Sequence, residues 1–274
     1  MKNKVLILLA VVVIISIAVV VIISGRGEDN KDNQTEECGY PIEYQGYNYS
    51  TVQIGDKCWF SENCRYIPIG ADGEPMYASE WGEASISEPL YYHSWFEEKG
   101  GVLYNTSAAL DNTICPKGWH LATEADYTDL INYTSGLTLK NFFDWYPTNK
   151  DSLKEEDASS LVLAANSMKS IEGWELYGDT LNGSNSSGFN GLPGGRIFPN
   201  AKGSTGEEGD AGYWWAKPNQ TDLVGASEPF RNYRQFRGLG EISLCKGSPS
   251  RPLSGYRDNF MNYSAAYSCR CVRD

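Results

Sequence analysis

Cysteine and histidine side chains lie five residues apart in the stretch CPKGWHLATEADYTDL, which runs from Cys115 to Leu130. A thiol beside an imidazole can act as a nucleophile–base pair, so Cys115 and His120 are candidates for catalysis. The alternative is architectural, with Cys115 in a disulfide and Trp119 in the core ahead of a helix. We favour the architectural interpretation, because a cysteine oxidised to a disulfide cannot attack a substrate.

The chain has seven cysteines, and all of them follow residue 37. They are Cys38, Cys58, Cys64, Cys115, Cys245, Cys269 and Cys271. None of their spacings is the C-x-x-C that structural zinc sites prefer, and the chain has only two histidines, His93 and His120. Disulfides are therefore the better interpretation, and the odd number leaves at least one thiol free or bridged to another molecule.

The N-terminal region contains an apolar run, Val5 to Ile23, with Ser16 as its only polar residue. A helix of this length would be roughly 28 Å long, enough to cross the hydrocarbon core of a bilayer. Lys2 and Lys4 precede the run and acidic residues follow it, which places the C-terminal bulk outside the cell. We expect a cytoplasmic end at residues 1–4 and a signal anchor at residues 5–24; a cleaved signal peptide is the alternative.

The rest of the chain is expected to form a stalk and one extracellular domain. Residues 25–37, GRGEDNKDNQTEE, contain no large apolar side chain and predict a flexible stalk, so the domain would span residues 38–274. The formal net charge of −12 argues against binding nucleic acid. Glycosylation is permitted by N-x-S/T triplets. These begin at Asn33, Asn48, Asn105, Asn132, Asn182, Asn185, Asn219 and Asn262.

Local patterns predict both strands and helices. Residues 49–60 alternate in polarity around a turn at Gly55-Asp56, which is typical of a β-hairpin. Thr123 and Asp126 resemble a capping box at the start of a helix. Residues 155–168 predict a second helix, and the terminal YSAAYSCRCVRD alternates as a strand.

Several longer motifs occur in the order that is typical of a known family. They are YSTVQIGDKCWFSEN, CPKGWHLATEADYTDL, GFNGLPGGRI, GYWWA and CRCVRD. With these motifs the chain resembles the Fibrobacter succinogenes major paralogous domain from about Cys38 to Asp274. Three positions depart from the family pattern: Cys64 replaces a leucine, Ala122 replaces a proline, and Cys269 is an additional cysteine.

That family is similar, more distantly, to the C-type-lectin-like fold and to formylglycine-generating enzymes. The resemblance implies an α+β fold with two helices, a twisted antiparallel sheet and a long loop-rich region that carries the ligand surface. It also implies disulfides between Cys115 and Cys271 and between Cys38 and Cys58. Cys245 would then pair with Cys269, which would leave Cys64 free.

The same resemblance raises two further kinds of chemistry. Cys269 and Cys271 form a C-x-C pair whose thiolates would suit Cu(I) in an oxidase, although disulfides explain them better. Lys217-Pro218-Asn219, followed by Asp222, resembles a calcium loop of sugar-binding lectins. Lys217 stands where an oxygen ligand is wanted, so we expect a plain turn there and no cofactor.

Aromatic residues offer the best prediction of a recognition surface. The chain has 8 Trp, 18 Tyr and 9 Phe, and aromatic faces stack on sugars and anchor protein interfaces. We expect most Trp residues in the core, but Trp215 must face away from Trp214 if both lie in one strand. The predicted exposed surface comprises Tyr213, Trp215, Asn219, Asp222, Arg231 and Tyr233.

Together these patterns predict a single-pass cell-surface protein whose lectin-like domain binds carbohydrate or another surface protein without catalysis. One alternative is a thiol or copper oxidase of the formylglycine-generating type. Another is a structural component of the cell envelope.

Overall fold

The computed structural model describes residues 37–76, 89–93, 100–111, 113–149, 152–176, 179–180, 182–197, 205–217, 240–245, 253–257 and 266–274. The helices are α2 (Thr106–Ala109), α3 (Glu124–Ser135), α4 (Phe142–Asn149) and α5 (Glu155–Met168). The strands before α3 are β1 (Ile42–Tyr44), β2 (Tyr47–Tyr49), β3 (Thr51–Ile54), β4 (Lys57–Phe60), β5 (Tyr91–His93), β6 (Val102–Asn105) and β7 (Trp119–Leu121). The later strands are β8 (Glu175–Leu176), β9 (Asp179–Thr180), β10 (Gly194–Ile197), β11 (Thr205–Glu208), β12 (Ala211–Ala216), β13 (Gly240–Cys245), β14 (Leu253–Arg257), β15 (Ala266–Tyr267) and β16 (Cys271–Arg273).

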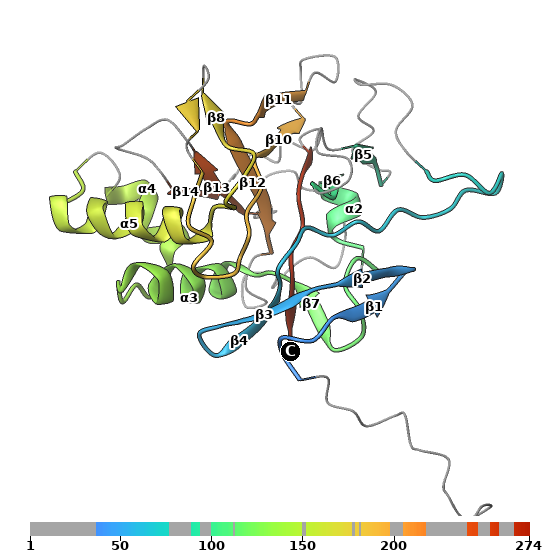
Figure 1. Ribbon diagram of the computed structural model, residues 1–274, viewed down its shortest axis with the longest axis horizontal. Coiled ribbons are helices and arrows are strands. Elements are labelled where there is room, and N and C mark those ends of the chain that lie inside the picture. The colour runs from blue at the N-terminus through green and yellow to red at the C-terminus, as the bar shows by residue number, and fades with distance from the viewer. Residues whose placement is uncertain are drawn as a thin grey trace, which may run out of the picture. The chain divides into compact units, whose positions relative to one another are not determined.

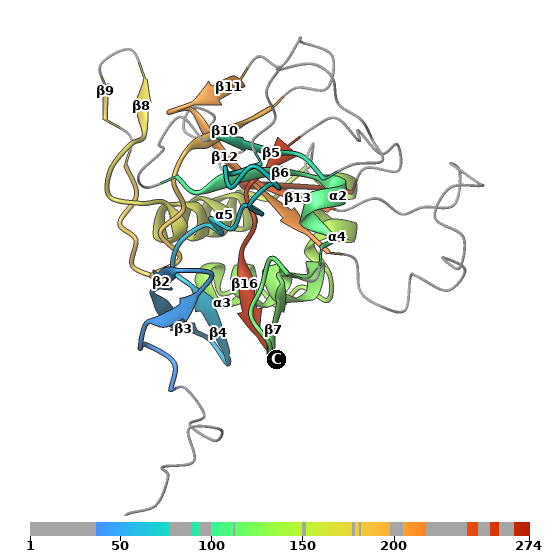
Figure 2. The same ribbon diagram turned by 90° about the vertical axis from the view of Figure 1, so that its right-hand side faces the viewer.

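A small antiparallel sheet has the strand order β3-β4-β16-β7. Its first two strands form the predicted hairpin, with Ile54 opposite Lys57 across the turn. Gly55 has a φ of +58° in that turn, a conformation that glycine adopts without the steric cost of a side chain. The last strand of the chain, β16, lies between β4 and β7, so residues far apart in sequence form this sheet (Figure 2).

A larger sheet has the order β14-β13-β12-β10-β15-β6-β5, with β11 paired to β10. Its pairs are antiparallel except β10 with β12, which meet in parallel at Gly195 and Gly212. Helices α3, α4 and α5 lie together beside it (Figure 1), and α4 and α5 contact β14. The described residues therefore confirm an α+β fold with mainly antiparallel sheets and few helices.

Both predicted helices are confirmed. At the start of α3, Thr123 Oγ1 accepts from the backbone N–H of Asp126, and the Asp126 carboxylate accepts from the backbone N–H of Thr123. The helix ends at Gly136, which has a φ of +74°. Helix α5 has the predicted bounds, and its buried face carries Leu161, Ala164, Ala165 and Met168.

Helix α4 is an element that the sequence patterns did not indicate. Its eight residues include a proline, and the segment is too short for a clear apolar period. The Asn141 side chain accepts from the N–H groups of Phe143 and Asp144 and so caps the helix. Phe142, Phe143 and Tyr146 are buried in the core, so tertiary packing stabilises the helix.

The segment from β15 to β16 joins the two sheets. Ser268 pairs with β12, since its N–H donates to Tyr213 O and its carbonyl accepts from the N–H of Trp215, both at 3.0 Å. Four residues later, Val272 lies opposite Trp59 of β4 and His120 of β7. The chain end therefore passes from one sheet into the other without a turn.

Arg270 lies in this segment and is fully buried. Its guanidinium donates to Asn63 Oδ1 (2.8 Å) and to the carbonyls of Phe60 (2.9 Å), Phe189 (2.7 Å) and Asn190 (3.1 Å). It also lies 4.3 Å from the centroid of the Phe189 ring. Burial lowers the pKa of Arg270 to about 10, so the group remains a cation at neutral pH. Its hydrogen-bond partners within the described residues are all uncharged, and those on Phe60, Asn63 and Phe189 belong to buried residues, whose acceptors need partners.

Two disulfides follow the predicted pairing. Cys38 is bonded to Cys58, and Cys115 to Cys271, across sequence separations of 20 and 156 residues. Cys64 is free, as expected, but Cys269 also carries a free, buried thiol. The predicted bridge between Cys245 and Cys269 is therefore wrong. The predicted membrane anchor at residues 5–24 lies outside the described residues, as does the predicted stalk except for its last residue, Glu37. No described helix is long and apolar enough to cross a bilayer.

Replacing Arg270 by lysine should lower the free energy of unfolding by about 3 kcal/mol or more, because one ammonium cannot reach acceptors on four residues. The measurement is urea unfolding of the full chain in detergent, followed by tryptophan fluorescence. Arg65→Lys is the matched control, since Arg65 is half-buried beside Glu62 and should cost less than about 1 kcal/mol. Equal stability of Arg270→Lys and the wild type would contradict this role.

The two disulfides should differ in their contribution to stability. The chain-entropy model gives about 5 kcal/mol for the bridge that closes the longer loop and about 3 kcal/mol for the shorter. Unfolding of the double variants Cys115→Ala/Cys271→Ala and Cys38→Ala/Cys58→Ala measures both values. A larger loss of stability on removing the Cys38–Cys58 disulfide than on removing the Cys115–Cys271 disulfide would show that loop length does not determine which disulfide contributes more.

Candidate functional site

The Cys115–Leu130 stretch folds as a tight turn, a short strand and a capped helix. The N–H of Trp119 donates to Pro116 O at 3.0 Å, which closes the turn before β7. Trp119 and Leu121 then pack against the core cluster that also contains Cys115 and Cys271, while His120 points to the opposite side of the strand. Among the described strands β7 pairs with β16 alone, so its other edge is open.

Asp126 is the centre of a polar cluster at the start of α3. Its carboxylate accepts from Lys57 Nζ (2.6 Å), from Thr123 Oγ1 (2.6 Å) and from the Thr123 N–H (2.8 Å). His120 Nε2 lies 2.9 Å from the same carboxylate, and His120 Nδ1 lies 2.6 Å from Asp274. The Asp126 side chain is only 2% exposed, whereas the Asp274 side chain is 63% exposed, so the cluster extends from a buried carboxylate to the surface.

The pKa values of this cluster favour the charged forms. Burial would raise the pKa of Asp126, but hydrogen bonds from His120, Lys57 and Thr123 outweigh it and hold the pKa well below its usual range. The hydrogen bond to Asp126 raises the pKa of His120 against the opposing effect of burial, with Asp274 adding to the rise. Both imidazole nitrogens are thus bonded to carboxylates, and His120 acts as a structural cation.

Cys115 and His120 do not form a catalytic dyad in this arrangement. The Cys115 sulfur is bonded to Cys271, and neither nitrogen of His120 faces it as a free base. The Cys269–Cys271 pair is likewise not a dithiol, because Cys271 is oxidised while Cys269 is a buried thiol. The Cys115–Leu130 stretch therefore has the architectural arrangement, with Cys115 in a disulfide and Trp119 packed against the core ahead of a helix.

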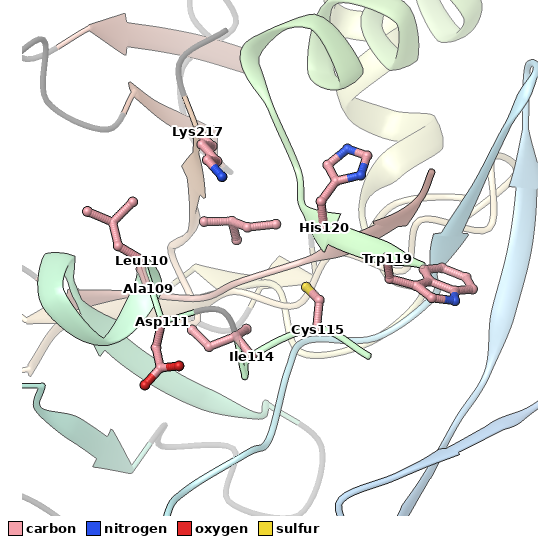
Figure 3. Close-up of a pocket in the computed structure, with 9 residues that line it drawn as sticks. Ala109, Leu110, Asp111, Ile114, Cys115, Trp119, His120 and Lys217 are labelled. Carbon is pink, nitrogen blue, oxygen red and sulfur yellow. The ribbon is translucent and has the colours of Figure 1, made fainter. Parts of the chain in front are cut away.

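A pocket of about 80 Å³ lies beside the open edge of β7, between this strand, α2 and the end of β12. Its lining residues are Ala109, Leu110, Asp111, Ile114, Cys115, Trp119, His120, Leu121 and Lys217. Figure 3 shows the ammonium of Lys217 directed into the space between Leu110 and His120, with Cys115 at the base and Asp111 turned outward. Apolar side chains form most of the lining, and Asp111, His120 and Lys217 add polar and charged groups to it.

Lys217 is fixed in place by its backbone. Its N–H donates to Ala122 O and its carbonyl accepts from the N–H of Glu124, both at 2.9 Å, so the residue joins β12 to the start of α3. In the part of the chain that the structure describes, its ammonium has no ion-pair partner.

The predicted recognition surface is wrong at its two described residues. Trp214 and Trp215 do face opposite sides of β12, but Tyr213 and Trp215 are 6% and 5% exposed. Both pack with Tyr267 in a second core cluster, and Trp215 Nε1 donates to Tyr104 O at 2.7 Å. Strand β12 is covered on both faces, so alternation does not expose either side.

The other predicted surface residues lie outside the described residues; they are Asn219, Asp222, Arg231 and Tyr233. Asn219 and Asp222 are also the two residues that would supply oxygen ligands in the lectin-type calcium loop. Among the described residues, one group of possible metal-ligating side chains is close enough to share an ion: Cys64, Cys115 and Cys271, whose sulfurs lie within 4.8 Å of one another. Two of these sulfurs are joined in a disulfide and are therefore not thiolate ligands.

Sequence analysis identified Cys115, Trp119 and His120 but missed most of the other residues of the site. Lys217 was noted only as the first residue of a turn, and Asp126 only as a helix cap. Lys57 and Asp274 come from opposite ends of the domain, and no local pattern connects them to His120. The pocket-lining residues at the end of α2 and just after it, within residues 109–114, carry no motif at all.

Replacing Asp126 by asparagine should lower the pKa of His120 toward 6.5, because the carboxylate is the largest cause of the rise. NMR titration of the imidazole signals measures this value. Asp274→Asn should give a smaller change in the same direction, whereas Asp129→Asn, at an exposed residue, should give little change.

His120 also makes the stability of the domain depend on pH. Because the folded-state pKa of His120 is raised, its contribution is complete below about pH 6.5 and is lost as the pH rises through the folded-state pKa. The free energy of unfolding should therefore decline as the pH rises from 6 to 9, and this decline should be smaller in Asp126→Asn than in the wild type. A wild-type pKa at or below 6.5 would contradict the proposed cluster.

Comparison with known proteins assigns the chain to a family but to no characterised relative. No curated protein and no solved structure matches it significantly. The family model of the Fibrobacter succinogenes major domain matches residues 52–273, from within β3 to the end of β16. This range covers most of the chain and includes the hairpin, the pocket-lining residues and Arg270. The protein belongs to the Fibrobacter succinogenes major domain family.

Proposed function

We propose that the domain is a non-catalytic recognition module that binds carbohydrate at the pocket lined by Trp119, His120 and Lys217. The observation that carries the proposal is the ammonium of Lys217, which is directed into a small hollow with apolar side chains around it. Recognition sites commonly combine an apolar lining with a few fixed polar groups in this way. The proposed site thus replaces the aromatic surface expected on β12.

The dimensions of the pocket suit one substituent of a larger ligand. A volume of about 80 Å³ accommodates a few water molecules, or a hydroxyl or carboxylate group. Such a group could accept a hydrogen bond from Lys217 Nζ while the rest of a sugar ring contacts Leu110 and Trp119 at the margin. Trp119 is partly buried against Phe60, with their ring centroids 4.9 Å apart, so its indole is held in a fixed orientation.

The cysteine chemistry supports a location outside the cell. Two disulfides in one domain persist in an oxidising environment and are rare in the cytosol. The proposed anchor is the apolar run Val5–Ile23, with the acidic domain on the outer side of the membrane. The N-x-S/T triplets of the domain are compatible with this location and permit a glycoprotein.

The C-type-lectin-like fold is part of the same proposal. Its support is the bridge between Cys115, ahead of α3, and Cys271 in the last strand, together with two longer helices beside an antiparallel sheet. A surface-protein ligand is the competing form of recognition. A thiol or copper oxidase is less well supported, because Cys271 is held in a disulfide.

Replacing Lys217 by methionine should weaken carbohydrate binding by roughly 10- to 100-fold, since a hydrogen bond to a charged group contributes about 1.5 to 3 kcal/mol. The full chain in detergent is first applied to a glycan array, and the sugars that bind are then titrated against wild type and variant. Lys140→Met is the matched control, because Lys140 is exposed and distant in sequence from the pocket residues.

The outcomes separate the proposed classes. Binding that is lost in Lys217→Met and kept within twofold in Lys140→Met supports the site. Sugar binding that both variants retain would place recognition elsewhere in the chain. A silent array, combined with capture of a surface protein, would favour the protein-ligand form and overturn the carbohydrate proposal.

A further inference from the structure

Three cysteine sulfurs meet beneath the pocket. Cys64 Sγ lies 3.4 Å from Cys271 Sγ, which is itself bonded to Cys115. All three sulfurs lie within 4.8 Å of one another. A free thiol is therefore in van der Waals contact with one sulfur of the disulfide that closes the domain.

The contact is held by the fold on both sides. The N–H of Cys64 donates to Cys269 O, and its carbonyl accepts from the N–H of Val102, both at 3.0 Å. Cys64 and Cys271 are both 0% exposed, so neither side chain can turn toward solvent without a local rearrangement. Cys115 differs from both, because it is 8% exposed and lines the pocket.

We propose that Cys64 exchanges with the Cys115–Cys271 disulfide, so that the domain has a second disulfide isomer in which Cys64 is bonded to Cys271 and Cys115 is a free thiol in the pocket. The proposal does not depend on carbohydrate binding, because it concerns bonds between residues of this chain. It gives the pocket a latent nucleophile that could be trapped by an electrophile, or by exchange with a disulfide of another molecule, which releases one thiol of that molecule.

The exchange is balanced in atoms and electrons. Cys64 loses its proton and its sulfur attacks Cys271 Sγ, so the Cys64–Cys271 bond forms as the Cys115–Cys271 bond breaks. Cys115 leaves as a thiolate and takes up the proton that Cys64 released. One disulfide and one thiol are present before and after, so the step requires no oxidant or reductant.

The surroundings favour Cys115 as the leaving group and the present bridge as the resting state. Lys217 lines the same pocket as Cys115, and a nearby cation stabilises a thiolate. Burial raises the pKa of the Cys64 thiol to about 12, against the opposing effect of Arg270, so the attacking thiolate is rare at neutral pH. Release of Cys115 is therefore expected to be slow and to accumulate only when the new thiol is trapped.

The test is to trap the Cys115 thiol with N-ethylmaleimide in the folded full-length chain at constant pH. Samples are quenched in acid over time, digested without reduction and mapped by mass spectrometry. Labelled Cys115 should increase together with a peptide that contains the Cys64–Cys271 bond. Cys64→Ala should slow the labelling of Cys115 at least tenfold, because the attacking sulfur is absent.

Cys269→Ala is the matched control, since Cys269 is the other buried free cysteine among the described residues, and labelling should stay within twofold of wild type. An intact Cys115–Cys271 bridge after prolonged treatment would overturn the proposal, as would equal labelling of Cys115 in Cys64→Ala. If Cys64→Ala does not fold, Cys115→Ala refolded with oxidised and reduced glutathione serves instead. In that variant a Cys64–Cys271 disulfide is expected, and two free thiols at these positions would overturn the proposal.

Discussion

The buried guanidinium of Arg270 is the interaction on which the rest of the domain depends. A cation without a carboxylate partner is costly to remove from water, and here fixed oxygens replace the lost hydration. These oxygens belong to Phe60 at the end of β4, to Asn63 after it, and to Phe189 and Asn190 in the loop before β10. One side chain therefore sets the relative position of three segments that are far apart in sequence.

The residues around Arg270 extend this organisation to the pocket. Asn63 also accepts from Trp214 Nε1 and donates to Ser268 Oγ, which couples the guanidinium to β12. Next to Arg270, Cys271 bonds to Cys115, and three residues further Asp274 contacts His120. The last strand thus connects two of the core clusters and lies beside the strand that borders the pocket, although the side chains that line the pocket come from other elements.

Chemically reactive residue types serve structural roles in much of this region. His120 is a cation between two carboxylates, and Cys115 closes a long loop. Beside the same edge of β7, Lys217 lines the pocket, and three cysteine sulfurs lie close together beneath it. The structural and the proposed binding features are therefore adjacent, because the pocket forms where the strand edge, the helix cap and the disulfide meet.

Local features of this protein follow directly from its amino-acid order. The hairpin at Gly55, the capping box of Thr123 and Asp126, and the bounds of α5 depend on residues a few positions apart, whose spacing fixes their geometry. The family motifs are sufficient to identify the domain, and the resemblance they carry implies the Cys115–Cys271 bridge. Local sequence patterns do not predict the burial of Tyr213 and Trp215, the partners of His120, or the contact of Cys64 with Cys271. Each depends on segments that pack together only after long loops close, and strand alternation gives the face of a residue without showing whether another layer covers it.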